Sequence, residues 1–159
     1  MTDLSQTNFF EFEADFTESL RCIPMIVRYK LDTCGVKLKL FHWNQLSQTQ
    51  RQQLVETPCA TALEAAAYRT QLRDWVQQQT GNLPSDLPVE AQPAWMDASQ
   101  IPESVATAAA AVGQTLSLIQ WQHLLPIQRF ALIKLSRSQH ENANFLPALQ
   151  EFHLVAAPI

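Results

Sequence analysis

Glycine is scarce in this chain, with three residues among 159. So few glycines leave no glycine-rich loop that could cradle a phosphate group. The sequence also contains no G-x-S-x-G turn, and its four histidines share no metal-ligand spacing such as H-x-x-x-H. Because the common signatures of nucleophilic and metal-assisted catalysis are missing, the sequence favours a binding protein over an enzyme.

Charged residues are also few, at 16%, and the formal net charge is −4, which argues against nucleic acid as a partner. The apolar runs are short, so we expect no contact with a membrane. The N-terminus has neither a basic region nor an apolar region of the kind found in signal peptides, and we therefore expect a cytoplasmic protein. With 47% apolar residues, the chain can bury the core of a single domain spanning residues 1–159.

Cysteine occurs three times, an odd count that suits free thiols in a reducing compartment. The spacing matches no C-x-x-C metal pattern, so we expect neither a metal nor a bound cofactor. Cys34 falls on an apolar helical stripe and is expected in the core, whereas the sequence leaves the place of Cys22 open. Cys59 stands just before a helix N-terminus, where a thiol pKa is lowered, and is the best candidate for reactivity or ligation.

The chain contains an internal duplication. Eleven of 32 positions in residues 23–54 are identical in residues 101–132, where composition alone gives about two. The likeness continues after one deletion, so the repeats span 23–80 and 101–154. The stretches GVKLKLFHW and GQTLSLIQW, at 35–43 and 113–121, share glycine, two leucines and tryptophan in register.

Each repeat predicts three helices. The first follows a proline and stops at Gly35 or Gly113. The second begins at the capping box Ser47–Gln50 in one repeat and at Pro126 in the other, where it is apolar almost all round. The third begins at Thr61-x-x-Glu64 and ends at Gly81, and its copy opens with Ser138-x-x-Glu141 and should kink or restart near Asn144 because of Pro147.

Alternating leucines after the first helix of each repeat, around residues 37–40 and 115–118, predict two short strands that pair antiparallel. The expected fold is therefore mainly all-α, with two pseudo-symmetric three-helix repeats and a small two-stranded β-ladder between them. A Pro-rich connector at 82–98 joins the repeats and is expected to be pinned by Trp95. The acidic and aromatic arm at 1–16 could lie on the core or face a partner.

Charge is unevenly distributed along the chain. Residues 1–20 carry five acids and no base, while residues 21–51 carry six bases and one acid. These runs are either solvated faces, or segments that dock on each other or face a charged partner protein. A polar run at 136–145 is either a helix cap with a loop or a recognition patch. The candidate partner-binding residues are Glu11, Glu13, Asp15, Lys37, Lys39, Arg137, His140, Glu141, Asn142 and Asn144.

Four stretches carry a family resemblance: FEADFTESLRCIPMIVRYKLDTCGVKLKLFHW, TPC at 57–59, PAWMD, and QRFALIKLSRSQHENANFLPALQEFHL. Together they resemble the nitrate reductase-associated protein family of cyanobacteria, the NarM type, over residues 9–154. The resemblance implies a cytoplasmic accessory subunit or maturation factor of ferredoxin-dependent assimilatory nitrate reductase. That enzyme carries a molybdopterin cofactor and an iron–sulfur cluster, and the resemblance brings no catalytic residues.

Two hypotheses follow. In the first, the chain is a non-catalytic partner of nitrate reductase that is needed for its activity. In the second, it carries or inserts a cofactor or iron–sulfur cluster with Cys22, Cys34 and Cys59. The sequence leaves the binding face and the oligomeric state open.

Overall fold

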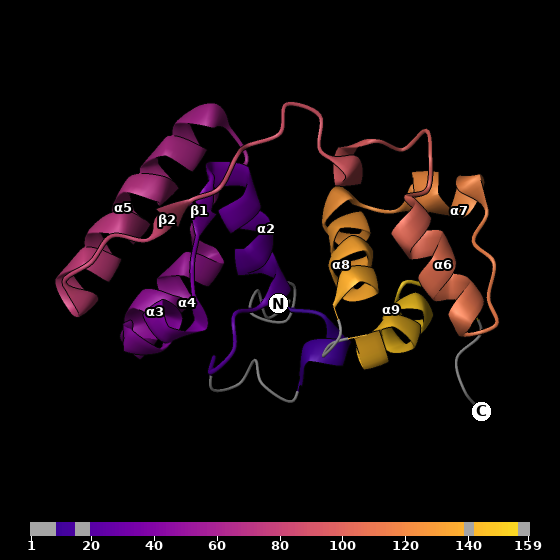
Figure 1. Ribbon diagram of the computed structural model, residues 1–159, viewed down its shortest axis with the longest axis horizontal. Coiled ribbons are helices and arrows are strands. Elements are labelled where there is room, and N and C mark those ends of the chain that lie inside the picture. The colour runs from indigo at the N-terminus through magenta and orange to yellow at the C-terminus, as the bar shows by residue number, and fades with distance from the viewer. Residues whose placement is uncertain (1–8, 15–19, 139–141, 156–159) are drawn as a thin grey trace, which may run out of the picture. The chain divides into compact units, whose positions relative to one another are not determined.

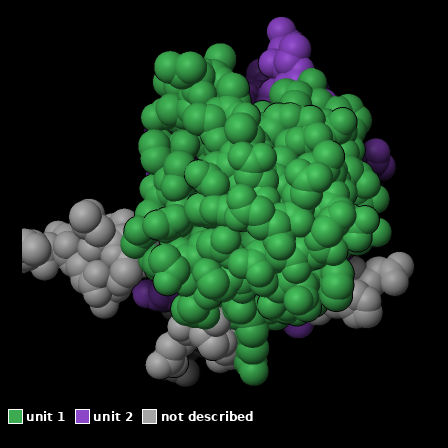
Figure 2. All heavy atoms as spheres, turned by 90° about the vertical axis from the view of Figure 1, so that its left-hand side faces the viewer, with its two compact units in different colours: residues 1–9, 13–89 green, residues 10–12, 90–159 purple. Residues whose placement is uncertain are grey.

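The computed structural model describes residues 9–14, 20–138 and 142–155, and its chain divides into two compact units. Unit 1 comprises residues 1–9 and 13–89, and unit 2 comprises residues 10–12 and 90–159 (Figure 2, green and purple). Each unit holds one of the two sequence repeats. The organisation into a single domain stays a prediction.

The described part of unit 1 contains helices α2 to α5 and a two-stranded sheet (Figure 1). Helix α5 is the longest and packs against α2, α3 and α4. In chain order its elements within residues 20–89 are α2 (Met25–Cys34), β1 (Val36–Lys37), α3 (Leu40–Gln45), α4 (Gln48–Glu56), α5 (Ala62–Thr80) and β2 (Ser85–Asp86).

The described part of unit 2 contains helices and no strand, and α8 is its central element, packed against α6, α9 and two 3₁₀ turns. The expectation of a buried second helix in this repeat is confirmed, since Phe130, Ala131, Leu132 and Leu135 are all fully buried. Its described elements are η2 (Glu11–Glu13), whose last residue belongs to unit 1, η3 (Ala94–Met96), α6 (Glu103–Ala111), α7 (Leu118–His123), α8 (Pro126–Arg137), η4 (Asn142–Asn144) and α9 (Phe145–Glu151).

The predicted helix ends are confirmed where capping residues marked them. Ser47 accepts the N–H of Gln50 at the start of α4, and Thr61 accepts the N–H of Glu64 at the start of α5. Gly35 and Gly81 end α2 and α5 in the left-handed conformation, with φ of 81° and 79°. Helix α9 begins at Phe145, which agrees with the predicted restart near Asn144, whereas most of the Ser138–Glu141 box lies outside the described residues.

The predicted pairing between the two repeats is wrong. A small antiparallel sheet exists, but β1 pairs with β2 from the connector, with Val36 opposite Asp86 and Lys37 opposite Ser85. The Leu87 N–H also donates to the Gly35 carbonyl at 2.8 Å. A nearby segment of the same unit therefore satisfies this backbone, and residues 115–117 form no strand.

The two stretches expected to continue as strands turn instead into six-residue helices, α3 and α7. Ser117 caps α7 by accepting the N–H of Gln120, and the Lys39 N–H donates to His42 Nδ1 at 3.4 Å at the matching position in unit 1. Alternation over four residues is too short to separate a strand from an extended lead-in to a helix, and the capping residues decided the outcome.

Element boundaries recur along the chain. Helices α6, α7 and α8 each begin 78 residues after α2, α3 and α4, which start at residues 25, 40 and 48. The tryptophan of each short helix, Trp43 or Trp121, is fully buried. The repeated sequence thus encodes repeated local structure, while a symmetry axis relating the repeats stays a prediction.

Replacement by alanine should destabilise the protein more at Gly35, which ends α2, than at Gly81, which ends α5. A Cβ atom on Gly35 would lie 2.8 Å from Val89 Cγ2 and 3.0 Å from the Leu87 carbonyl oxygen, whereas one on Gly81 would meet nothing within 4 Å. Both substitutions incur the cost of a positive φ, about 1 kcal/mol, but Gly35→Ala should cost about 3 kcal/mol because of the added clash.

Urea unfolding of both alanine variants measures the difference. Equal losses of stability for Gly35→Ala and Gly81→Ala would show that the β2 segment does not hold the end of α2 as described.

Candidate functional site

The acidic arm is divided between two roles. In unit 2, the rings of Phe10 and Phe12 pack against Phe152, with centroid distances of 5.1 and 6.4 Å, and Glu11 is exposed beside them. In unit 1, Glu13 is only 1% exposed, and its carboxylate accepts the N–H of Met25 at 2.6 Å, at the start of α2. The described arm is therefore laid on the core, and Asp15 lies outside the described residues.

The two lysines of the candidate set are exposed on unit 1. Lys37 and Lys39 stand on either side of Leu38, which packs against the core. The two residues that follow, Leu40 and Phe41, are apolar yet 51% and 61% exposed. This segment combines positive charge and apolar surface over five consecutive residues.

The polar run near the end of α8 is only partly described. Arg137 and Asn142 are exposed and Asn144 is half-buried, whereas His140 and Glu141 lie outside the described residues. Asn142 lines a groove in unit 2, so part of the predicted recognition patch borders a hollow of the surface.

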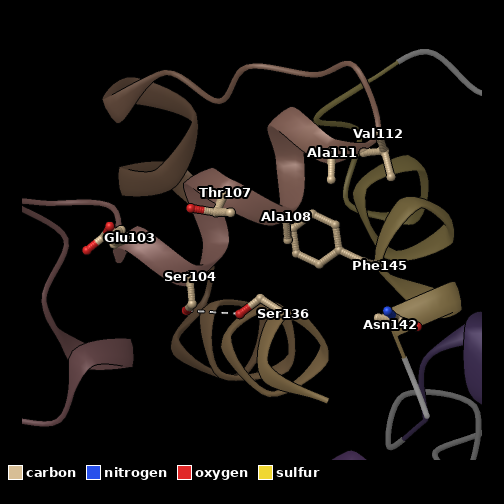
Figure 3. A pocket seen from close by; sticks show the side chains of 9 residues that line it. All are labelled: Glu103, Ser104, Thr107, Ala108, Ala111, Val112, Ser136, Asn142 and Phe145. Carbon is tan, nitrogen blue, oxygen red and sulfur yellow. Dashed lines mark hydrogen bonds between the residues drawn. The ribbon is translucent and has the colours of Figure 1, made fainter. Parts of the chain in front are cut away.

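This groove has a volume of about 600 Å³ and follows one face of α6. Figure 3 shows that α6 contributes mainly small side chains and that Phe145 points toward them from α9. Within the groove, the hydroxyl of Ser136 on α8 donates to the hydroxyl of Ser104 on α6 at 3.0 Å, which links the two helices. The lining residues are Glu103, Ser104, Thr107, Ala108, Ala111, Val112, Ser136, Asn142 and Phe145.

Unit 1 holds larger groups at the matching positions. The repeat alignment places Lys30 where unit 2 has Ala108, and Tyr68 where unit 2 has Phe145. The Lys30 ammonium lies 5.9 Å from the centroid of the Tyr68 ring and donates to the carbonyl oxygens of Val55 and Thr57, both at 2.6 Å. Lys30 thereby satisfies carbonyl groups at the C-terminal end of α4. In unit 1 the buried side chains of Lys30 and Tyr68 occupy the positions that correspond to groove-lining residues of unit 2.

Two thiols share this filled region. Cys34 and Cys59 are 7% and 6% exposed, and Cys59 Sγ lies 3.7 Å from the carbonyl oxygen of Lys30, one turn before Cys34 on α2. The expectation of a buried Cys34 is confirmed. Cys59, whose place before a helix N-terminus predicted a lowered pKa, instead lies buried in the core of unit 1.

Burial and mutual contact shift the titration of these groups. Burial lowers the pKa of the Lys30 ammonium, although the nearby Cys59 and Glu56 oppose that shift. The hydrogen bond with Cys59 lowers the pKa of the Cys34 thiol, and the same bond, together with burial, raises the pKa of Cys59. Burial also raises the pKa of Tyr68, whose hydroxyl donates to the Leu54 carbonyl at 2.8 Å. Lys30, Tyr68, Cys34 and Cys59 therefore form one buried network whose members shift one another's pKa.

The third cysteine, Cys22, is half-buried. Within the described ranges, no group of three or more histidine, cysteine, aspartate or glutamate side chains is placed to hold a metal ion. A carrier that uses all three cysteines would therefore have to rearrange the core of unit 1.

Two arginines at matched positions of the repeats, Arg51 and Arg129, donate to backbone carbonyl groups. Arg51 donates to the carbonyl oxygens of Leu46 and Leu20 at 3.2 and 3.0 Å. Arg129 donates to the Leu124 carbonyl at 2.7 Å, and to the Trp95 carbonyl at 2.7 Å. The second bond and the Trp95–Phe130 ring contact at 5.1 Å confirm that Trp95 pins the connector.

Sequence reasoning missed Lys30 and Phe41 as notable residues, and it assigned Leu40 to a strand, whereas Leu40 opens α3 and is 51% exposed. Their signal lay in the repeat alignment: a lysine opposite alanine within a buried stripe, and an apolar pair retained at an exposed position in both copies.

No helix in the described part of the chain is long and apolar enough to cross a membrane. The family described as conserved nitrate reductase-associated protein matches residues 9–152. No curated protein and no solved structure matches the chain. The match confirms the resemblance to the family, while the cyanobacterial type stays a prediction.

The hydrogen bonds of Lys30 predict that its replacement lowers the stability of the protein far more than replacement of the exposed Lys37. Replacement of Lys30 by Met removes two charge-assisted hydrogen bonds and leaves the carbonyls of Val55 and Thr57 without that donor. We expect Lys30→Met to lower the free energy of unfolding by about 3 kcal/mol. The exposed Lys37→Met should change it by less than about 0.5 kcal/mol.

Urea unfolding at neutral pH compares the two variants directly. A Lys30→Met protein as stable as Lys37→Met would contradict the capping role.

Thiol burial predicts the order of chemical labelling. With Ellman's reagent, the native protein should show one readily reacting thiol, Cys22, because Cys34 and Cys59 are closed off in the core. The Cys22→Ser variant should lose the fast phase, and all remaining thiols should react after denaturation. A second fast thiol in native Cys22→Ser would mean that the cluster opens to solvent.

Proposed function

Because the chain belongs to the family of conserved nitrate reductase-associated proteins, we propose that it binds assimilatory, ferredoxin-dependent nitrate reductase as a non-catalytic accessory or maturation protein. We further propose that the enzyme needs this protein for its activity. The observation that carries the proposal is the family match, which extends over residues 9–152 of 159. A match of that extent concerns the whole described fold rather than one motif.

The interior of the protein supports a binding role. Its buried charged groups, Glu13, Lys30 and Arg129, each bond to backbone and thus stabilise helix ends and loops. Because these buried charged groups already bond to the backbone, the exposed side chains are the groups that would contact a partner.

Titration of the purified chain against apo and mature nitrate reductase tests the proposal. We expect saturable binding to at least one form, and a rise in ferredoxin-dependent nitrate reduction when the chain is added to apo enzyme and cofactor. A stable complex at fixed stoichiometry identifies a subunit, whereas activation that outlasts removal of the chain identifies a maturation factor. Absence of binding to both forms would exclude the proposed function.

The cluster-carrier alternative is separated by removal of the thiols. A variant with Ala at positions 22, 34 and 59 should still activate the enzyme if the chain acts by binding, and should fail if cysteines carry the cargo. Thermal unfolding of this variant, followed by circular dichroism, controls for loss of the fold.

A further inference from the structure

An exposed apolar pair recurs at matched positions of the two units. Leu40 and Phe41 open α3 with 51% and 61% exposure, and Leu118 and Ile119 open α7 with 41% and 67% exposure. In both copies the preceding leucine is half-buried and the following tryptophan is fully buried. The pairs are therefore held at the surface by their neighbours rather than left there by a loose loop.

The surroundings of the two pairs differ in charge. Lys37 and Lys39 precede the pair in unit 1, while Thr115 and Ser117 precede the pair in unit 2. Both lysines are exposed, and neither forms an ion pair with any residue that the structure describes. We name Lys37–Phe41 the basic apolar patch, and Thr115–Ile119 the neutral copy.

The basic apolar patch is positioned in advance. Leu38 packs on the core of unit 1, so the lysines on either side of it point outward. The Lys39 N–H donates to the Nδ1 atom of His42, and the rings of Phe41 and His42 lie 5.9 Å apart. A partner would meet apolar contact area flanked by positive charge, with little ordering cost from the backbone.

We propose that the basic apolar patch is the docking surface for an acidic segment of a partner protein that carries apolar side chains, and that the neutral copy does not bind this segment. Opposite charge would steer the segment to Lys37 and Lys39, and Leu40 and Phe41 would supply the apolar contact. In naming nitrate reductase as the protein that carries this segment, the inference rests on the proposed function; the patch itself does not.

A protein segment fits this patch better than an anionic membrane. Stable membrane attachment of a surface segment draws on a long amphipathic face and several basic residues, whereas α3 has six residues and the patch has two lysines. Two lysines next to one apolar pair match the length of a short acidic segment.

The patch is tested first without the reductase. The full-length chain, labelled with ¹⁵N, is titrated with the peptide EELFEELF and with its basic counterpart KKLFKKLF. We expect only the acidic peptide to shift the amide resonances of residues 37–41, less so at raised salt. Lys37→Glu with Lys39→Glu should weaken binding about tenfold or more, and the matched Thr115→Glu with Ser117→Glu should change it less than about twofold. Failure of the acidic peptide to bind, or equal shifts at 115–119, would overturn the inference.

The reductase is then tested with paired variants. Phe41→Ser should weaken its binding about tenfold, while Ile119→Ser should leave it unchanged. Thermal unfolding should show both variants folded because both side chains are exposed. Binding of the reductase that is indifferent to Phe41 and to the lysines overturns the inference and leaves the proposed function standing. Peptide binding at 37–41 without reductase binding supports the patch and overturns the proposed function.

Vesicles of phosphatidylserine and phosphatidylcholine provide the remaining arm. We expect no co-sedimentation of the wild-type chain with them. Co-sedimentation that is lost in the Lys37→Glu, Lys39→Glu variant would assign the patch to lipid and overturn the inference.

Discussion

Each unit depends on one buried tryptophan whose indole N–H must find an acceptor inside the protein. Trp43 donates to the Leu20 carbonyl at 2.7 Å, and Trp121 donates to the Asp97 carbonyl at 3.0 Å. Both acceptors lie in the chain that leads into the repeat, and an arginine of the next helix also bonds to that lead-in segment. Because an unsatisfied indole in the core would be costly, this bond fixes the entry to each repeat and thereby the position of its helices.

The two units use this common frame differently. In unit 1, Lys30, Tyr68 and two thiols fill the space beside the last turn of α2, and α5 runs for 19 residues over the core. In unit 2, alanine replaces the lysine, and α9 has only seven residues. Ala108 lines the groove along α6, where its small side chain leaves volume unfilled.

The sequence predicted best what is decided locally. Capping boxes located the starts of α4 and α5, since each capping side chain lies within three residues of the N–H group that it accepts. Left-handed glycines located the ends of α2 and α5. It failed for β1, whose partner is set by tertiary contact with Ser85 and Asp86, and for α3, where a four-residue alternation resembled a strand. The inward place of Cys59 could not be read either, because it depends on how the loop after α4 folds against α2. Among the candidate partner residues, the sequence could not distinguish the buried Glu13 from the exposed Glu11. The Glu13 carboxylate accepts the N–H of Met25 at the start of α2.

Duplication offers an internal reference for where binding evolved. Residues required by the frame are shared between the repeats: the tryptophan, the arginine cap and the glycine are the same in both. Exposed residues contribute little to the stability of the fold, so they can differ between the repeats without destabilising it. The apolar pairs at the start of α3 and α7 are exposed in both units, yet only unit 1 places lysines beside them. A charge difference between two otherwise equivalent surfaces changes which partner is attracted and leaves the core unchanged. We therefore expect unit 1 to determine the specificity of partner binding.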